Sequence, residues 1–252
     1  MSDSTNNAVN ESKLFQVMGL GPLWEPRDGN AQGPQQPVAI DGGPPSNESS
    51  AGELSVEGLQ EVKSSLPTLE ELAIQVSSCQ ACGLCKTRKQ TVFSAGVARS
   101  DLMVIGEAPG ADEDAQGEPF VGRAGQLLDK MLKAVDRSRS QNVYIANVLK
   151  CRPPGNRNPE PAEIASCSPY LMQQIELSKP KALLLVGSFA IRTLLNTQDA
   201  VGKVRGRVHQ VQVGGITLPT VASYHPAYLL RNPVEKRKSW EDLQLLQSLL
   251  KA

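Results

Sequence analysis

From about residue 68 to the C-terminus, short apolar segments alternate with amphipathic helical segments, and this alternation constrains the fold more than any other feature. Each apolar segment spans four to seven residues, which suits a strand buried on both faces. Strands separated by helices form a parallel sheet with helices on its two faces. We therefore expect a three-layer α/β/α domain over residues 67–252, with a short, mainly parallel central sheet. The expected strands are 101–106, 143–149, 182–186 and 220–223, with a hairpin at 204–217, and the expected helices are 127–135, 162–177, 188–195 and 234–250.

Residues 1–66 differ in character from the rest of the chain. The stretch 29–50 is rich in Gly, Pro, Gln, Asn and Ser, and it cannot bury enough apolar surface to offset the entropy lost on ordering. We expect a disordered acidic arm, followed by a first helix that begins with the capping-box pattern of Thr68 and Glu71. Within the arm, seven apolar side chains gather at 14–24. This motif predicts either a short peptide that docks on a protein partner or a segment that folds back on the domain.

Charge is divided unevenly along the chain, although 26 basic and 26 acidic residues cancel overall. Residues 1–70 carry 3 basic and 10 acidic side chains, a balance of −7, whereas residues 71–252 carry 23 basic and 16 acidic side chains, a balance of +7. A basic body attracts polyanions such as nucleic acids, and these would repel the acidic arm. An ordinary solvated surface would show the same balance, so charge alone does not decide between the two.

No segment of the sequence predicts export or membrane insertion. The longest apolar run, 182–186, is far shorter than the roughly 20 residues that span a bilayer, and the polar N-terminus has no basic region followed by an apolar one. We therefore expect a cytoplasmic protein in a reducing compartment. There, an odd number of cysteines, five, favours ligation of a metal or cluster over disulfides.

Three polar motifs lie at the ends of expected strands: Gly106-Glu-Ala-Pro-Gly110, Asn147 with the loop after it, and His225-Pro-Ala-Tyr-Leu-Leu-Arg231. In an open α/β sheet, ligands bind beyond the carboxyl ends of the strands, so these motifs should meet at one mouth. The glycines of the first motif permit close approach of the backbone to a flat ligand. Four carboxylates, at 107 and 112–114, argue against a cradle for a nucleoside triphosphate.

Two further side chains near this mouth are candidates for ligand contact. Phe120 lies in a polar loop, where it could stack on a flat ligand or anchor the loop in the core. His225 stands where a strand ends and a helix begins, a position that favours a neutral imidazole and suits stabilisation of an anionic leaving group. His209, the other histidine, lies among valines of the expected hairpin, and we interpret it as structural.

The cysteines have the spacing of a ligand set. Cys79, Cys82 and Cys85 form C-x2-C-x2-C, and Cys151 and Cys167 follow after a gap of 65 residues. Four thiolates can hold Zn²⁺ or an iron–sulfur cluster. The spacing decides neither the metal nor which of the first three cysteines is spare.

At these motifs the chain resembles the type-4 uracil-DNA glycosylases, a family that carries a [4Fe-4S] cluster. The similar strings lie in order across about residues 70 to 250 and leave residues 1–66 outside. They are Cys79-Gln-Ala-Cys82, Gly106-Glu-Ala-Pro-Gly110, Gly117-Glu-Pro-Phe-Val-Gly-Arg-Ala-Gly125, Asn147-Val-Leu-Lys-Cys-Arg-Pro-Pro154 with Asn156-Arg157, Cys167, Lys203-Val-Arg-Gly206 and His225-Pro-Ala-Tyr-Leu-Leu-Arg231.

The resemblance implies a role for each matching residue. It implies that Cys79, Cys82, Cys151 and Cys167 hold the cluster, which leaves Cys85 without a ligand role. It implies that uracil is bound by Gly106, Glu107, Ala108, Phe120, Asn147 and His225. The implied catalytic residues are His225, Glu107 and Glu113, with Glu113 either excluding thymine or orienting water. We interpret the cluster as structural, because it would join the first helix to the proline-rich loop after Cys151, and redox signalling is the alternative.

Uracil excision is chemistry that these residues suit. A base must be flipped out of DNA before its glycosidic bond can be reached. Uracil offers O4 as an acceptor and N3–H as a donor, which the carboxamide of Asn147 can meet side by side, whereas cytosine reverses this pattern. A donor from His225 at O2 would stabilise the departing uracil anion.

We therefore expect a monomeric, monofunctional DNA repair glycosylase that removes uracil and leaves an abasic site. From their place in loops near the mouth, Arg152, Arg157, Lys203, Arg205 and Arg231 are expected to contact the DNA. Two alternatives from other classes are a non-catalytic four-cysteine metal-binding protein that binds DNA, and an iron–sulfur electron carrier.

Overall fold

The computed structural model of the protein describes residues 67–251. The arm expected at 1–66 and its apolar motif at 14–24 lie outside the described residues. The first helix, α2 (Leu69–Ser77), begins with the predicted capping box: the Thr68 hydroxyl accepts from the Glu71 amide, and the Glu71 carboxylate accepts from the Thr68 amide. In the described part of the chain, no helix combines the length and apolar character that a membrane span requires.

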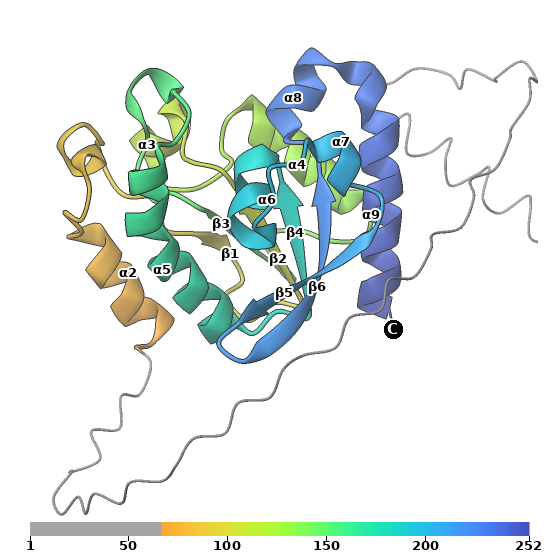
Figure 1. Ribbon diagram of the computed structural model, residues 1–252, viewed down its shortest axis with the longest axis horizontal. Helices are drawn as coiled ribbons and strands as arrows, with labels where there is room; N and C mark the ends of the chain where they lie inside the picture. Colours follow the sequence, from red (N-terminus) through yellow and green to blue (C-terminus); the bar gives the residue numbers. More distant parts are fainter. Residues whose placement is uncertain (1–66, 252) are drawn as a thin grey trace, which may run out of the picture. The chain divides into compact units, whose positions relative to one another are not determined.

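A six-stranded sheet forms the centre of the domain (Figure 1). Its order is β1-β3-β2-β4-β6-β5, in which β3, β2, β4 and β6 run parallel and both outer strands run antiparallel to their neighbours. The sheet is therefore mainly parallel, as the sequence predicts. The strands are β1 (Ala95–Gly96), β2 (Leu102–Gly106), β3 (Val143–Asn147), β4 (Ala182–Val186), β5 (Val208–Val213) and β6 (Ile216–Ser223).

Helices cover both faces of this sheet and complete the predicted three-layer α/β/α arrangement. Side chains of α4, α8 and α9 pack on one face, and side chains of α5 and α6 pack on the other. The helices after α2 are α3 (Ala111–Gln116), α4 (Arg123–Lys133), α5 (Pro161–Ser178), α6 (Ser188–Leu195), α7 (Val201–Val204), α8 (Pro226–Arg231) and α9 (Lys236–Lys251), with short 3-10 turns η1 (Gly83–Lys86), η2 (Pro154–Asn156) and η3 (Pro233–Glu235).

The central strands are buried along their whole length because they serve two cores. In β2, Leu102 and Val104 pack toward α4 and α9, whereas Met103 and Ile105 pack toward α5 and α6. Strands with helices on both faces carry continuous apolar runs instead of alternating ones. The apolar segments that define the sequence pattern are therefore these doubly covered strands.

Several strand boundaries differ from the prediction. β3 ends at Asn147 instead of position 149, and Val204 ends the helix α7 instead of opening the hairpin, whose first strand begins at Val208. The expected hairpin ended at Thr217 and a separate strand began at Thr220, but β6 runs without a break from Ile216 to Ser223. Pro219 lies inside it and pairs with Gln210 of β5, whereas pairing with β4 begins only at Thr220. Proline lacks an N–H group, and it is tolerated here because the strand has a neighbour on one side only at that point.

Candidate active site and cysteine cavity

The carboxyl ends of the parallel strands open into one cleft of about 910 Å³. Glu107, Asn147 and His225, which follow or end β2, β3 and β6, line the same cleft, so the predicted convergence is confirmed. Gly187 and Ser188, which follow β4, line it as well. The strand-end rule applies equally to these two residues and could have identified them from the sequence.

Asn147 is the last residue of β3 and lies at the floor of the cleft. It is 2% exposed, and its Oδ1 atom has no hydrogen-bond partner among residues 67–251. A buried polar atom that lacks a partner costs on the order of 1–3 kcal/mol. The amide is therefore held ready for a polar ligand that enters the cleft.

The ring of Phe120 lies against the main chain of Gly106 and beside Asn147. A Cβ atom at Gly106 would come within 2.6 Å of Phe120 Cζ and would collide with Asn147 Oδ1, so only glycine fits there. The same ring stacks on the imidazole of His225, with ring centroids 5.6 Å apart and planes inclined by 29°. Main chain, one aromatic ring and one amide thus form the floor of the cleft.

Phe120 has a left-handed backbone conformation with φ of +57°, which is unfavourable for a bulky residue. Arg139 holds this conformation, because its guanidinium donates to the carbonyl oxygens of Pro119 (3.2 Å) and Phe120 (2.8 Å) and pairs with Asp129 (2.8 Å). Gly125 contributes by having no side chain, since a Cβ atom there would collide with the Phe120 carbonyl. The orientation of the ring is therefore fixed by its surroundings.

His225 caps the N-terminus of α8 with its own side chain. Its Nδ1 atom accepts from the Ala227 N–H group (3.1 Å), so the proton of the neutral ring lies on Nε2. Burial, with a further contribution from Arg231 and a small opposing one from Glu113, lowers the pKa of His225 to about 4. At neutral pH the imidazole is thus uncharged and offers an Nε2–H donor.

The two candidate catalytic carboxylates differ in their surroundings. Glu107 lines the cleft, and burial raises the pKa of its carboxyl group. Glu113 also lines the cleft, but its oxygens accept from the N–H groups of Gly110 (3.0 Å), Val121 (3.1 Å) and Gly122 (3.2 Å). These bonds tie the start of α3 to the loop that carries the aromatic ring, which suits a positioning role for Glu113.

The basic residues that were predicted to contact DNA fall into two groups. Arg152, Lys203 and Arg231 form no ion pair within residues 67–251, and Arg231 lines the cleft. Arg157 lines the cleft too, but its guanidinium binds both oxygens of Glu163 at 2.9 and 2.6 Å. The first group has no carboxylate partner among the described residues, although Arg152 Nε donates to Asn156 Oδ1 (2.7 Å), whereas Arg157 is paired with Glu163.

Arg205 is largely buried against helix α9. Its side chain is 11% exposed, and it pairs with Glu241 (2.9 Å) and Asp242 (2.9 Å). Asp242 also accepts from Ser223, the last residue of β6. This geometry suits a structural role for Arg205, and the phosphate contact that its loop position suggested stays a prediction with which these acidic partners on α9 compete.

Other residues complete the lining of the cleft. Tyr224 and Tyr228 stack on each other at a centroid distance of 5.0 Å, and Arg192 of α6 also lines the cleft. Gly187 has φ of +96°, and a Cβ atom there would lie 3.1 Å from His225 Cβ. The absent side chain at Gly187 therefore lets the end of β4 approach the histidine.

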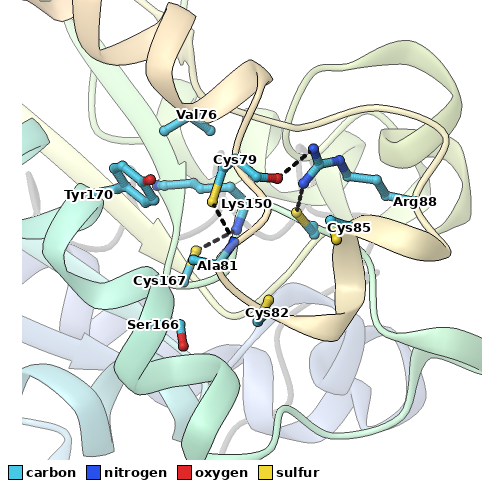
Figure 2. A pocket seen from close by; sticks show the side chains of 11 residues that line it. Val76, Cys79, Ala81, Cys82, Cys85, Arg88, Lys150, Ser166, Cys167 and Tyr170 are labelled. Atoms are coloured by element: carbon cyan, nitrogen blue, oxygen red, sulfur yellow. Dashed lines mark hydrogen bonds between the residues drawn. The ribbon is translucent and has the colours of Figure 1, made fainter.

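All five cysteines line a second, smaller cavity next to α2, η1 and α5 (Figure 2). Cys151 and Cys167 are buried, and Cys79, Cys82 and Cys85 are half-buried. The sulfur atoms of Cys79, Cys82 and Cys167 lie around a common space in Figure 2. The four predicted ligands are thus brought together, and Cys85 lies on the wall of the same cavity.

Hydrogen-bond donors surround the sulfur atoms of this cavity. Three N–H groups donate to them: Arg88 to Cys151 Sγ (3.0 Å), the Lys150 main chain to Cys167 Sγ (3.3 Å), and the Ala81 main chain to Cys79 Sγ (3.5 Å). N–H groups that donate to sulfur stabilise thiolates and tune the group that thiolates bind.

The electrostatics and spacing of the thiols indicate what the cavity can hold. Burial raises the pKa of Cys151 to about 11 and also raises the pKa of Cys167, and a bound cation would favour the thiolate form of both. In the described residues, no three cysteine, histidine or acidic side chains are placed to hold a single metal ion. Four thiols that share one cavity have the donor chemistry of a thiolate-bound metal centre or cluster.

Known proteins with similar sequences match the part of the chain that forms this fold. A family profile described as the uracil DNA glycosylase superfamily matches residues 93–244, and the chain belongs to this superfamily. Proteins named type-4 uracil-DNA glycosylase from Archaeoglobus fulgidus and Thermotoga maritima are each 38% identical to the chain, over 188 and 186 residues. These alignments cover 73% of this chain and 94% and 95% of the two relatives, so within the superfamily the chain is a member of the type-4 family. A type-5 uracil-DNA glycosylase from Pyrobaculum aerophilum is 33% identical over 142 residues, which cover 51% of this chain and 62% of that protein. The resemblance predicted from the motifs is confirmed.

Proposed function

We propose that this protein removes uracil from DNA as a repair glycosylase: it accepts a flipped uracil in the cleft, hydrolyses the N-glycosidic bond and leaves an abasic site. The observation that carries this proposal is the buried, unpaired amide oxygen of Asn147 at the cleft floor, beside the Gly106 main chain and the Phe120 ring. The names of the type-4 relatives support it.

Recognition of the base follows from the floor of the cleft. The Asn147 Oδ1 atom accepts from uracil N3–H, the Asn147 amide donates to O4, and the flipped ring stacks on Phe120. Cytosine would present an acceptor and a donor in the reverse places, a mismatch that costs on the order of 10⁴-fold in rate in a site built around such bonds. The carbonyl groups of Gly106 and Glu107 accept from Val148 (3.0 Å) and Leu149 (3.0 Å), which fixes this segment as a wall that continues to Ala108.

Bond cleavage divides between His225 and Glu107. The bond from uracil N1 to the sugar breaks with both electrons leaving on the base, and the Nε2–H group of the neutral His225 stabilises the charge at O2. A water molecule, oriented by the Glu107 carboxylate, then adds to the electron-deficient sugar carbon. Glu107 accepts the proton that this water loses, and an equivalent proton neutralises the uracil anion, so that the products are the abasic sugar and uracil. Glu113 acts indirectly, by holding the loop of the stacking ring at a distance that leaves no room for the methyl group of thymine.

We also propose that the cysteine cavity holds a [4Fe-4S] cluster through Cys79, Cys82, Cys151 and Cys167. The support is the shared cavity, the N–H donors to sulfur and the thiol chemistry of the donor set. The bound group would supply a cross-link between the segment after α2 and the loop after β3, and no step of base removal passes through it. Cys85 would remain a free thiol.

DNA is held by basic side chains around the mouth of the cleft, for which Arg152, Lys203 and Arg231 are the best placed. A cytoplasmic location, a monomeric state and a protein partner for residues 14–24 remain predictions of the sequence. The two alternatives, a non-catalytic DNA-binding protein and an electron carrier, have no use for an unpaired amide and a neutral histidine in one cleft.

The direct test is to incubate the purified protein with a labelled oligonucleotide that contains one uracil and then to treat the product with alkali, which cleaves abasic sites. Oligonucleotides with thymine or cytosine at the same position are the matched controls. We expect strand cleavage only with uracil. Binding of all three oligonucleotides without cleavage would favour the non-catalytic alternative and overturn the proposal.

A further inference from the structure

Lys150 is a buried cation that the roles described above do not use. It is 1% exposed and is the largest fully buried side chain of the described chain. Its ammonium group donates to the main-chain oxygen of Asn147 (2.7 Å) and to the side-chain oxygen of Gln174. Both acceptors are neutral, and no carboxylate in residues 67–251 forms an ion pair with Lys150. Such burial is costly, which points to a role that an apolar residue could not fill.

The first contact of Lys150 fixes the residue that we propose reads uracil. Asn147 ends β3, and the pairing of β3 with the edge strand β1 reaches only to Ile145. The Asn147 carbonyl therefore lies beyond that edge strand, where the Lys150 ammonium binds it. Gln174 anchors the ammonium from the other side and is itself held by hydrogen bonds to Phe93 (3.1 Å) and the Tyr144 hydroxyl (3.2 Å). Lys150 thus ties the end of β3 to side chains that are already held in place.

The main chain of Lys150 belongs to the cysteine cavity. Its N–H group donates to Cys167 Sγ, Cys151 is the next residue, and Lys150 is part of the cavity wall (Figure 2). One residue therefore contacts both the cavity and the floor of the cleft.

We propose that Lys150 is a positioning residue that couples the cysteine cavity to uracil recognition, by holding the main chain of Asn147 in the orientation that presents its amide to the base. This inference rests on the proposed uracil excision. A misplacement of a reading group by about 1 Å costs about 10²-fold in rate. Because Lys150 acts through Asn147, its effect disappears when the Asn147 amide is absent.

The test compares Lys150→Met with a matched control, Lys133→Met, at an exposed position of α4. Both variants are purified with their iron and assayed on the uracil oligonucleotide. We expect Lys150→Met to lower kcat/KM about 10- to 100-fold, and to raise the inhibition constant of free uracil in the same direction. Iron content per chain and the cooperativity of thermal unfolding should stay at the level of the control. In single-turnover assays on an Asn147→Ala background, Lys150→Met should cause no additional loss.

Either of two results would overturn the inference: Lys150→Met equals Lys133→Met in both kcat/KM and uracil inhibition, or its loss persists undiminished in the Asn147→Ala background. If Lys150→Met does not accumulate as folded protein, Lys150→Gln, which keeps an N–H donor, is put through the same comparison, and a smaller loss in the same direction is expected. A wild-type protein that excises no uracil would instead defeat the proposed function, so the two failures are distinguishable.

Discussion

The cleft and the cysteine cavity lie four residues apart along the chain, at Asn147 and Cys151, yet they are built in opposite ways. The cleft is wide, at about 910 Å³, and its floor keeps an amide oxygen without a partner. The cysteine cavity is narrow, and three of its sulfur atoms already accept N–H bonds. Polar atoms that are left unpaired suit a ligand that enters and leaves, whereas atoms that are already bonded suit a group that stays.

The two sites also differ in the elements that support them. The residues of the cleft come from the ends of four parallel strands, whose positions the sheet fixes. The cysteines come from the segment after α2, from η1, from the loop after β3 and from α5. None of them lies in a strand of the sheet. We therefore expect that changes in the cleft alter activity without affecting the cavity, whereas changes in the cavity alter the content of bound iron first.

The largest effect is expected from Asn147→Ala. Loss of the amide removes both hydrogen bonds to uracil and should lower excision by about 10³-fold or more, comparable with removal of an essential transition-state donor. Excision is measured by alkali cleavage of the uracil oligonucleotide, and visible absorbance reports the cluster in the same samples. Activity close to that of the wild type would show that Asn147 does not read the base. Loss of the visible absorbance would show that a change in the cleft also affects the cysteine cavity.

Serine replacement of single cysteines tests the other side of the comparison. Cys79→Ser, Cys82→Ser, Cys151→Ser and Cys167→Ser should lose most of the bound iron, because a hydroxyl is a poor substitute for a thiolate. Cys85→Ser is the matched control and should keep its iron, although Cys85 lines the same cavity. Iron and acid-labile sulfide per chain are the readouts. Loss of iron in Cys85→Ser with Cys79→Ser unaffected would shift the ligand pair to Cys82 and Cys85.

The pH dependence reports on the cleft. The pKa of His225 is lowered to about 4 in the folded protein from its ordinary value of 6.5, so the unfolded chain binds a proton that the folded chain does not as the pH falls below 6.5. Stability from this group is therefore complete above about pH 6.5 and is lost progressively as the pH falls toward 4. Thermal unfolding at several pH values should show a weaker pH dependence in His225→Gln than in the wild type. An unchanged slope would mean that His225 titrates normally.

The salt dependence of DNA binding gives a smaller effect. If Arg152, Lys203 and Arg231 each neutralise one phosphate, the slope of log K against log salt on duplex DNA is roughly −2.7. Lys203→Ala should make this slope less steep by about 1. Arg205→Gln is the contrasting variant: it should lower the melting temperature, because Asp242 loses its partner, and leave the slope unchanged. A change of the salt slope in Arg205→Gln would show that Arg205 also contacts a DNA phosphate.

The smallest effect is expected from removal of residues 1–66. The residues that line the cleft and the cavity all follow residue 66, the first of them being Val76, so excision from short oligonucleotides should stay within about twofold of the full chain. The melting temperature distinguishes the two interpretations of the motif at 14–24. A drop of many degrees in melting temperature on truncation would support a segment that folds back on the domain. An unchanged melting temperature would favour the interpretation of 14–24 as a peptide that docks on a partner.

Much of the fold follows from the sequence because it depends on local patterns. The apolar runs of β2, β3 and β4 mark strands covered on both faces, and the rule for strand ends then places Glu107, Asn147 and His225 together without further information. The strand boundary at Pro219 was missed, because whether a proline breaks a strand depends on which side of that strand has a neighbour.

Contacts between distant segments account for what the sequence could not show. From the sequence, Arg205 resembles an ordinary basic loop residue. The structure shows that it pairs with Asp242, which lies 37 positions later in the chain. Arg139 holds the loop of Phe120 from 19 positions away, and no local pattern marks it. Lys150 looks like one more cation in a basic motif, and only the packing of α5 on the sheet reveals that it is buried.

Gly106 has a consequence for how this protein can change over generations. Any carbon added there meets the ring of Phe120 and the amide of Asn147, so the depth of the pocket cannot be adjusted in small steps at its base. A lineage that acquires a new base preference must do so at the side walls, where residues can be exchanged one at a time. Mutational libraries aimed at such a preference should therefore leave position 106 constant and vary its surroundings.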